Sequence, residues 1–234
     1  MKKHIPNTIT CCNLICGCIA TFWAFQSNYM LALLFIILGA VFDFFDGMTA
    51  RLLGVSSPIG KELDSLADVI TFGFAPSAML FNFLCTLLPC SMAYVPYVAF
   101  IMAAFSALRL AKFNLDERQA MGFIGLPIPA NALFWASLAA GWQWKTLFEP
   151  YPTAPVWVAA IVVAMMFVSC WLLVSEVPMF ALKFKHWGWR GNEVKYLFLL
   201  TSAVLIVVLG TLGIAAVIAW YVLLSLLTQK RAKA

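Results

Sequence analysis

Charged residues are scarce in this sequence. Asp, Glu, Lys and Arg together make up 11% of its 234 residues, whereas hydrophobic residues make up 64%. A soluble domain is about a quarter charged and roughly half apolar, so the composition excludes an ordinary soluble domain. The mean hydropathy of +0.94 predicts an integral membrane protein that has the lipid bilayer as its surroundings.

Histidine is scarcer still, and the cysteines lack a metal-binding pattern. The two histidines, His4 and His186, lie among basic residues near the expected membrane surfaces, without neighbours that would make them metal ligands. The seven cysteines are odd in number, lie mostly in apolar runs and show no zinc-type spacing with histidine. We therefore expect them to pack between helices as small hydrophobic residues. They are Cys11, Cys12, Cys16, Cys18, Cys85, Cys90 and Cys170.

The net charge of +5 does not indicate a nucleic-acid partner. Basic residues fall in short clusters between apolar segments, as they do at the cytoplasmic ends of membrane spans. The first apolar segment is not a typical signal peptide, because Trp23, Phe25 and Gln26 stand where small residues would mark a cleavage site. We expect that segment to stay in the membrane as the first span.

Apolar segments predict an all-α, polytopic transmembrane helix bundle. Six are long enough to cross the roughly 30 Å hydrocarbon layer: residues 7–25, 29–53, 63–88, 92–110, 127–144 and 156–174. Residues 54–60 are a turn by composition. A seventh run, 196–227, is too long for one ordinary span and short for two.

Charge favours a hairpin for this last run, with its bend at residues 210–213. A hairpin returns the basic tail to the side of the N-terminus, together with every Lys and Arg except Lys145, whereas one long helix strands the tail outside. We therefore predict about eight spans with both termini cytoplasmic. Residues 1–176 would form a six-span core, and residues 177–234 a basic connector followed by a C-terminal transmembrane hairpin.

Four aspartates stand out within the apolar background. Asp43 and Asp46 are three residues apart, and Asp64 and Asp68 are four apart, so each pair lies on one face of a helix. Carboxylates in membrane helices are costly and usually functional. Four of them directed at one point repel strongly unless cations lie among them. The pattern predicts a divalent-metal site at the cytoplasmic mouth of the bundle.

The residues between the two pairs suit a phosphate-bearing substrate. Mg²⁺ commonly bridges carboxylates to phosphates, and two ions stabilise the entering and leaving oxygens of a phosphoryl displacement. Gly47 and Ala50 leave room for a ligand against the backbone, Arg51 can pair with a phosphate, and the Ser57 hydroxyl can reach one. Alternatives stay open: the small residues also suit helix packing, and Arg51 also suits a positive-inside flank.

The pattern D-x-x-D-G-x-x-A-R, eight residues, then G-x-x-x-D-x-x-x-D resembles the signature of the CDP-alcohol phosphotransferase family. The resemblance implies transfer of a substituted phosphate from a CDP-linked donor to an alcohol, with release of CMP. It also implies Mg²⁺ or Mn²⁺, with two ions held by Asp43, Asp46 and Asp64, and Asp68 as a general base that also touches metal. All eight defined positions match: Asp43, Asp46, Gly47, Ala50, Arg51, Gly60, Asp64 and Asp68.

Four further segments resemble one branch of that family. They are I-P-N-T-I-T-C-C-N, S-L-A-D-V-I-T-F-G-F-A-P-S, R-L-A-K-F-N and F-I-G-L-P-I-P-A-N. They are similar to integral-membrane members that transfer the phosphatidyl group of CDP-diacylglycerol to L-serine. The resemblance implies a homodimer as the assembly. The predicted topology places the active site on the cytoplasmic side, and the length and the lack of a targeting segment suit a bacterial inner membrane.

The same resemblance implies a donor site, and the acceptor site is our own hypothesis. CDP-diacylglycerol would contact Asn7, Thr10, Gly47, Ala50, Arg51, Ser57 and Gly60, although Asn7 equally suits a helix cap. For the serine carboxylate we select Arg109, Lys112 and Asn114, at the end of the fourth span. The nearest alternative is the same chemistry with glycerol 3-phosphate or an inositol. A divalent-cation transporter is the alternative from another class, but the outer halves of the spans carry almost no ionisable residues.

Overall fold

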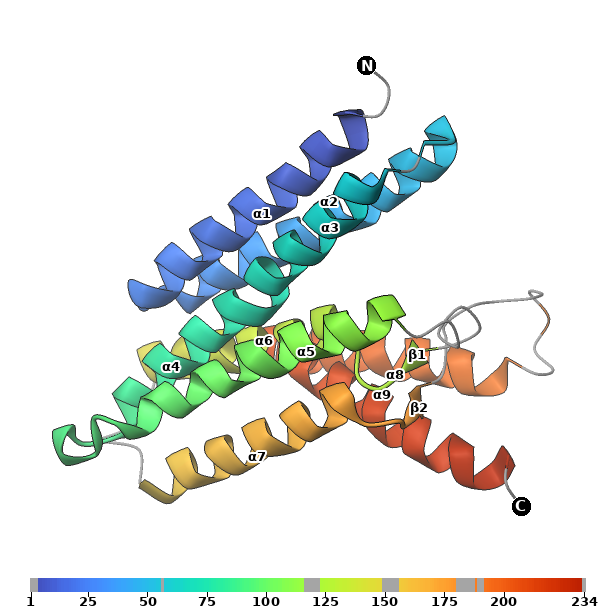
Figure 1. The fold of residues 1–234 in the computed structure, drawn as a ribbon. Helices are drawn as coiled ribbons and strands as arrows, with labels where there is room; N and C mark the ends of the chain where they lie inside the picture. Colours follow the sequence, from blue (N-terminus) through green and yellow to red (C-terminus); the bar gives the residue numbers. More distant parts are fainter. Residues whose placement is uncertain are drawn as a thin grey trace.

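The computed structural model describes residues 4–55, 57–115, 123–148, 156–179, 188 and 192–232, and it is a bundle of helices (Figure 1). The one ladder in these ranges joins two-residue strands, β1 (Phe123–Ile124) and β2 (Pro178–Met179), in antiparallel pairing. The all-α prediction is therefore confirmed. The helical elements are α1 (His4–Phe25), α2 (Tyr29–Leu53), α3 (Pro58–Asp68), η1 (Val69–Phe74), α4 (Ala75–Leu87), η2 (Cys90–Met92), η3 (Val95–Phe100), α5 (Ile101–Leu115), α6 (Ile128–Phe148), α7 (Val156–Val174), α8 (Glu193–Leu209) and α9 (Thr211–Ala232).

The turn between α2 and α3 is shorter than residues 54–60. Gly54 ends α2 in the left-handed conformation at φ 60°, which glycine adopts without a steric penalty. The side chain of Ser57 caps α3 by accepting a hydrogen bond from the Gly60 amide at 3.0 Å. Pro58 occupies the first turn, where its missing N–H costs nothing. The cap and the proline thus start α3 five residues before the expected span.

The third span is interrupted by a π-helical segment. α3, η1 and α4 form one continuous stretch from Pro58 to Leu87. η1 begins at Val69, immediately after Asp68, and has π geometry. π-helical turns are rare and occur frequently at functional sites.

Five stretches in the described ranges are long and apolar enough to cross a membrane, judged by length and composition. They are His4–Phe25, Tyr29–Leu53, Pro58–Leu87, Val95–Leu115 and Val156–Val174. The chain is therefore a polytopic helical membrane protein, while the count of eight spans stays a prediction. The fourth span differs from the expected 92–110, because a 3₁₀ segment precedes α5 and the helix continues to Leu115.

The N-terminal helices position the acidic stretch. α1 and α2 pack along their length, and α3 with η1 lies against α1 (Figure 1). Small residues allow this close approach: Ala20, Ala24 and Ala32 are fully buried. α6 packs on α2 and on α9, so it joins the N-terminal helices to the C-terminal pair.

At the bend expected at residues 210–213, the structure has two helices that meet. Gly210, at φ 58°, separates α8 from α9. The Trp220 indole N–H donates to the Thr201 hydroxyl at 3.0 Å, and the Phe198 and Tyr221 rings are 6.0 Å apart. These contacts join the two helices side by side, and the membrane side reached by each end stays a prediction.

The prediction for the cysteines is wrong at four positions. Cys16 and Cys170 are buried as expected, but Cys11, Cys18, Cys85 and Cys90 are exposed. The first three of these lie on helix faces that point out of the bundle. An uncharged thiol behaves as a small apolar group, so a lipid-facing surface accepts it as readily as a core does.

Candidate active site

Three of the four aspartates meet at one point. Asp43, from the second half of α2, and Asp64 and Asp68, from α3, each present a carboxylate oxygen, and these oxygens lie within 4.8 Å of one another. All three side chains are half-buried. Carboxylates this close repel when ionised, and oxygen donors of this type suit a hard divalent cation. The three residues therefore fit a divalent metal ion.

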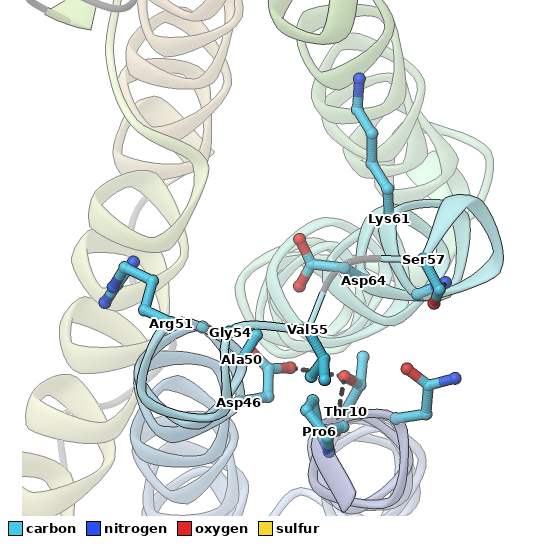
Figure 2. A pocket seen from close by; sticks show the side chains of 13 residues that line it. Pro6, Thr10, Asp46, Ala50, Arg51, Gly54, Val55, Ser57, Lys61 and Asp64 are labelled. Atoms are coloured by element: carbon cyan, nitrogen blue, oxygen red, sulfur yellow. Dashed lines mark hydrogen bonds between the residues drawn. The ribbon is translucent and has the colours of Figure 1, made fainter. Parts of the chain in front are cut away.

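Asp46 lies outside this group of three. It is one turn further along α2, it is buried, and it accepts a hydrogen bond from the Thr10 hydroxyl at 2.6 Å (Figure 2). This bond ties α2 to α1 and leaves the other carboxylate oxygen of Asp46 for another partner. The structure thus separates the four aspartates into a close group of three and a fourth anchored by Thr10.

A pocket with both apolar and charged lining residues opens beside the aspartates. It has a volume of about 490 Å³ and lies between the start of α1, the end of α2 and the start of α3 (Figure 2). Asp46 and Asp64 lie in its wall. The structure brings into this one pocket every residue that was expected to contact CDP-diacylglycerol: Asn7, Thr10, Gly47, Ala50, Arg51, Ser57 and Gly60.

Four further lining residues were not predicted. Lys61 is a second cation beside the pocket, and its place between Gly60 and Asp64 was a usable signal. Its ammonium and the Arg51 guanidinium lie on different sides of the pocket (Figure 2). Pro6, Gly54 and Val55 complete the lining, and no sequence pattern marks them as contacts of a substrate.

Glycine at position 60 allows α1 and α3 to meet. A Cβ added to Gly60 would lie 2.9 Å from both the Asn7 amide oxygen and the Ser57 hydroxyl. Asn7 lies inside α1, so its side chain faces this junction and does not cap the helix. At Gly47 the nearest group to an added Cβ is the Arg51 guanidinium, at 3.6 Å. Gly47 therefore faces open pocket space, and the helix-packing alternative does not apply there.

The three residues selected for serine all lie on α5 but differ in burial and in contacts. Arg109 is only 7% exposed, its guanidinium carbon lies 5.0 Å from the Phe113 ring centre, and its charge interacts with that of Asp68. Its Nε and Nη2 have no partner in the described part of the chain. Lys112 is exposed, and the Asn114 amide donates to the Ser65 hydroxyl at 2.9 Å, which ties α5 to α3. Of the three, Arg109 is the buried one beside the aspartates.

Two polar residues behind the aspartates were missed as site residues. Asn13 is fully buried, and its Nδ2 donates to Asp68 Oδ1 at 3.2 Å. The Thr71 hydroxyl in η1 donates to the Asn13 carbonyl at 3.0 Å. The available signal was spacing: Asn13 follows Thr10 by three residues, on the same face of an apolar helix.

Fold and site together define a class: a polytopic membrane protein whose carboxylates gather beside a pocket that holds both positive and negative side chains. The sequence profile of the CDP-alcohol phosphatidyltransferase family matches residues 3–181. The chain therefore belongs to this family. Members generally depend on divalent metal, in agreement with the group of three aspartates.

Curated relatives share one printed name, CDP-diacylglycerol–serine O-phosphatidyltransferase. The protein from Bacillus subtilis is 41% identical over 132 residues, which cover 54% of this chain and 70% of the relative. A Helicobacter pylori relative is 34% identical over 138 residues, which cover 55% of this chain and 54% of the relative. A Mycobacterium bovis relative is 28% identical over 234 residues, which cover 94% of this chain and 72% of the relative. The chain thus spans from about half to about seven tenths of the length of these relatives.

Proposed function

We propose that the protein transfers the phosphatidyl group of CDP-diacylglycerol to the hydroxyl of L-serine, forming phosphatidylserine and CMP. The observation that carries the proposal is the meeting of Asp43, Asp64 and Asp68 beside a pocket lined by all seven expected donor contacts. Membership of the family and the shared name of the relatives support the same reaction.

The pocket would hold the head of the donor while its acyl chains stay in the bilayer. Arg51 and Lys61 bring two positive charges to a diphosphate, and arginine suits phosphate oxygens in two-point contact. The junction of Asn7, Ser57 and Gly60 belongs to the same lining and would receive the sugar and base. A phosphotransfer site at a membrane surface suits a substrate that has both a charged head group and acyl chains.

The aspartates would hold two divalent ions, Mg²⁺ or Mn²⁺. Asp43, Asp64 and Asp68 form one set of donors, and Asp46 adds a fourth carboxylate at the pocket wall. Bound ions neutralise charge that develops on the transferred phosphate and on the leaving oxygen. Thr10 would keep Asp46 facing the ions through its hydrogen bond.

Asp68 would act as the general base. It accepts the proton of the serine hydroxyl as the serine oxygen bonds to the phosphorus that carries diacylglycerol. The bond from that phosphorus to the oxygen of CMP breaks, and CMP leaves with the bonding electron pair. Arg109, buried beside Asp68 with two unpaired nitrogens in the described chain, would pair with the serine carboxylate. Lys112 and Asn114 remain candidates for the rim of that site.

The larger arrangement is part of the same proposal. The site would face the cytoplasm from a bacterial inner membrane, with both termini cytoplasmic and about eight spans. Residues 1–176 would form the catalytic core, and residues 177–234 the connector and hairpin, which packs on the core through α6 and α9. Two copies would associate, and the mass of the protein in detergent tests this.

The deciding experiment supplies purified protein with CDP-diacylglycerol, Mg²⁺ or Mn²⁺, and isotope-labelled L-serine, and separates the lipid products. We expect labelled phosphatidylserine and an equal amount of CMP, and neither in the presence of EDTA. Product with glycerol 3-phosphate or inositol, and none with serine, would keep the chemistry and change the acceptor. No CMP with any alcohol would overturn the proposal, and metal uptake into vesicles would then test transport.

A further inference from the structure

We infer that Asn13 is a positioning residue that holds Asp68 in its working orientation. The inference rests on the proposed function, because it assigns Asn13 a task in that reaction. Asn13 is outside the pattern of eight matched positions and does not line the pocket. Its contact is with Asp68, through a hydrogen bond of 3.2 Å from Nδ2 to Oδ1.

The direction of this hydrogen bond follows from the chemistry of the two groups. An ionised carboxylate only accepts hydrogen bonds, so the amide of Asn13 must present its NH₂ side to Asp68. The bond occupies Oδ1 and fixes the plane of the carboxylate. Oδ2 is then left for the proton of the acceptor or for a metal ion. A base held in one orientation needs no rearrangement before the proton moves.

Asn13 is itself held from two sides. The Thr71 hydroxyl donates to the backbone carbonyl of Asn13 at 3.0 Å. This bond fixes η1 on α1, one turn beyond Asp68. The notch that receives Thr71 depends on two glycines: a Cβ on Gly17 would collide with Thr71, and a Cβ on Gly39 would collide with Thr71 and lie 3.0 Å from Asn13 Oδ1. α1, α2 and η1 thus enclose the amide tightly.

Stability alone does not explain an asparagine at this position. The side chain is fully buried, and its Oδ1 has no partner in the described part of the chain. A buried side-chain carbonyl without a donor destabilises the fold, and an apolar side chain of similar size avoids that penalty. The asparagine is explained if its N–H is needed at Asp68.

The test compares matched substitutions of two asparagines. Asn13→Leu removes the donor while keeping the side-chain size, and Asn13→Asp keeps the shape and, when ionised, presents only acceptors. Asn82→Leu is the control, because Asn82 donates to the Ala24 carbonyl and the Ser27 hydroxyl at the opposite end of α1, away from the pocket. Each variant is purified, its unfolding midpoint is measured, and kcat and KM are determined for serine and for CDP-diacylglycerol.

We expect both Asn13 variants to lower kcat about 10- to 100-fold, the range found when hydrogen-bond partners of metal ligands are removed. Both KM values should stay within about twofold, because Asn13 touches neither substrate. Asn82→Leu should lose stability and keep its kcat.

Three results would overturn the inference. The first is a kcat within about twofold of wild type in the Asn13 variants. The second is a rise of both KM values in step with the fall of kcat, which indicates a collapsed pocket. The third is loss of folding in both Asn13 variants while Asn82→Leu folds, which assigns Asn13 to stability alone. An inactive wild type would instead refute the proposed function, so the two failures are distinguishable.

Discussion

The helices around the aspartates and the C-terminal hairpin are built from similar apolar sequence, yet their contacts differ. Side chains of α1 bond across to α2 and α3 through Thr10 with Asp46 and Asn13 with Asp68. α8 and α9 meet through the rings of Phe198 and Tyr221 and through a hydrogen bond from Trp220 to Thr201. α8 buries only Phe198 and Ser202 of its 17 residues, whereas α4 buries nine of its 13.

The difference shows where polar groups are used in a membrane bundle. A polar bond between helices contributes only about 0.6 kcal/mol on average in lipid, so the bonds around the aspartates add little stability. They set the directions of carboxylates that would otherwise repel. The hairpin holds no comparable carboxylate group in the described residues and can present most of α8 to lipid. Substitutions that break polar geometry should therefore affect catalysis in the first region and only stability in the second.

The largest effect is expected at Asp68. Asp68→Asn keeps the shape of the side chain and removes the base, which should lower kcat about 10²- to 10⁴-fold. Glu62→Gln is the control, because Glu62 is an exposed acid on the same helix and away from the group of three. Release of CMP is the measurement. A kcat for Asp68→Asn close to that of Glu62→Gln would remove Asp68 from the reaction.

The second effect concerns the acceptor. Arg109→Gln should raise the serine KM about 30-fold or more, because removing one partner of a buried charge pair costs roughly 2–5 kcal/mol. Lys112→Gln, one turn away and exposed, should change that KM less than threefold. The KM for CDP-diacylglycerol should be unaffected in both variants. Equal serine KM values for the two would show that Arg109 does not bind serine.

Sequence predicts the acidic pairs and the donor residues well, because each depends on local spacing. Helical periodicity places Asp64 and Asp68 on one face, and Gly54, Ser57 and Pro58 mark the turn between the two pairs. The π segment after Asp68 was not predictable, since its geometry depends on how Thr71 packs against α1.

Contacts between helices that are distant in the sequence cannot be predicted from local spacing. Asn13 ends the segment I-P-N-T-I-T-C-C-N, but its partner is not evident from the sequence, because Asp68 lies 55 positions further along the chain. Arg109 and Lys112 were equivalent candidates, because an apolar helix shows almost no periodicity that separates its buried face from its lipid face. Only packing distinguishes them, with Arg109 buried and Lys112 exposed.

Two glycines at close helix contacts, Gly17 near the aspartates and Gly213 in the hairpin, test whether backbone packing affects catalysis in only one of the two regions. A Cβ at Gly17 would collide with Thr71, and one at Gly213 with the backbone of Leu205 and Ile206. Both Gly→Ala variants should lower the unfolding midpoint. Gly17→Ala should also lower kcat about tenfold, because it moves η1 and with it Asp68, whereas Gly213→Ala should keep at least half of the activity. Equal losses of kcat would show that the hairpin is coupled to the site.

The smallest effect is expected inside the hairpin. The Trp220 indole donates to the Thr201 hydroxyl at 3.0 Å, and this bond joins α8 to α9. Trp220→Phe and Thr201→Val each remove one partner, and each also loses other contacts, since Thr201 additionally donates to the carbonyls of Leu197 and Phe198. A double-mutant cycle isolates the shared bond. We expect a coupling of about 0.6 kcal/mol in the free energy of unfolding, with kcat unchanged in all three variants.

A coupling near zero would show that the rings and the bend at Gly210 are sufficient to form the hairpin. A fall in kcat would show that α9 transmits strain to the aspartates through α6, and the separation of the two regions would then be wrong.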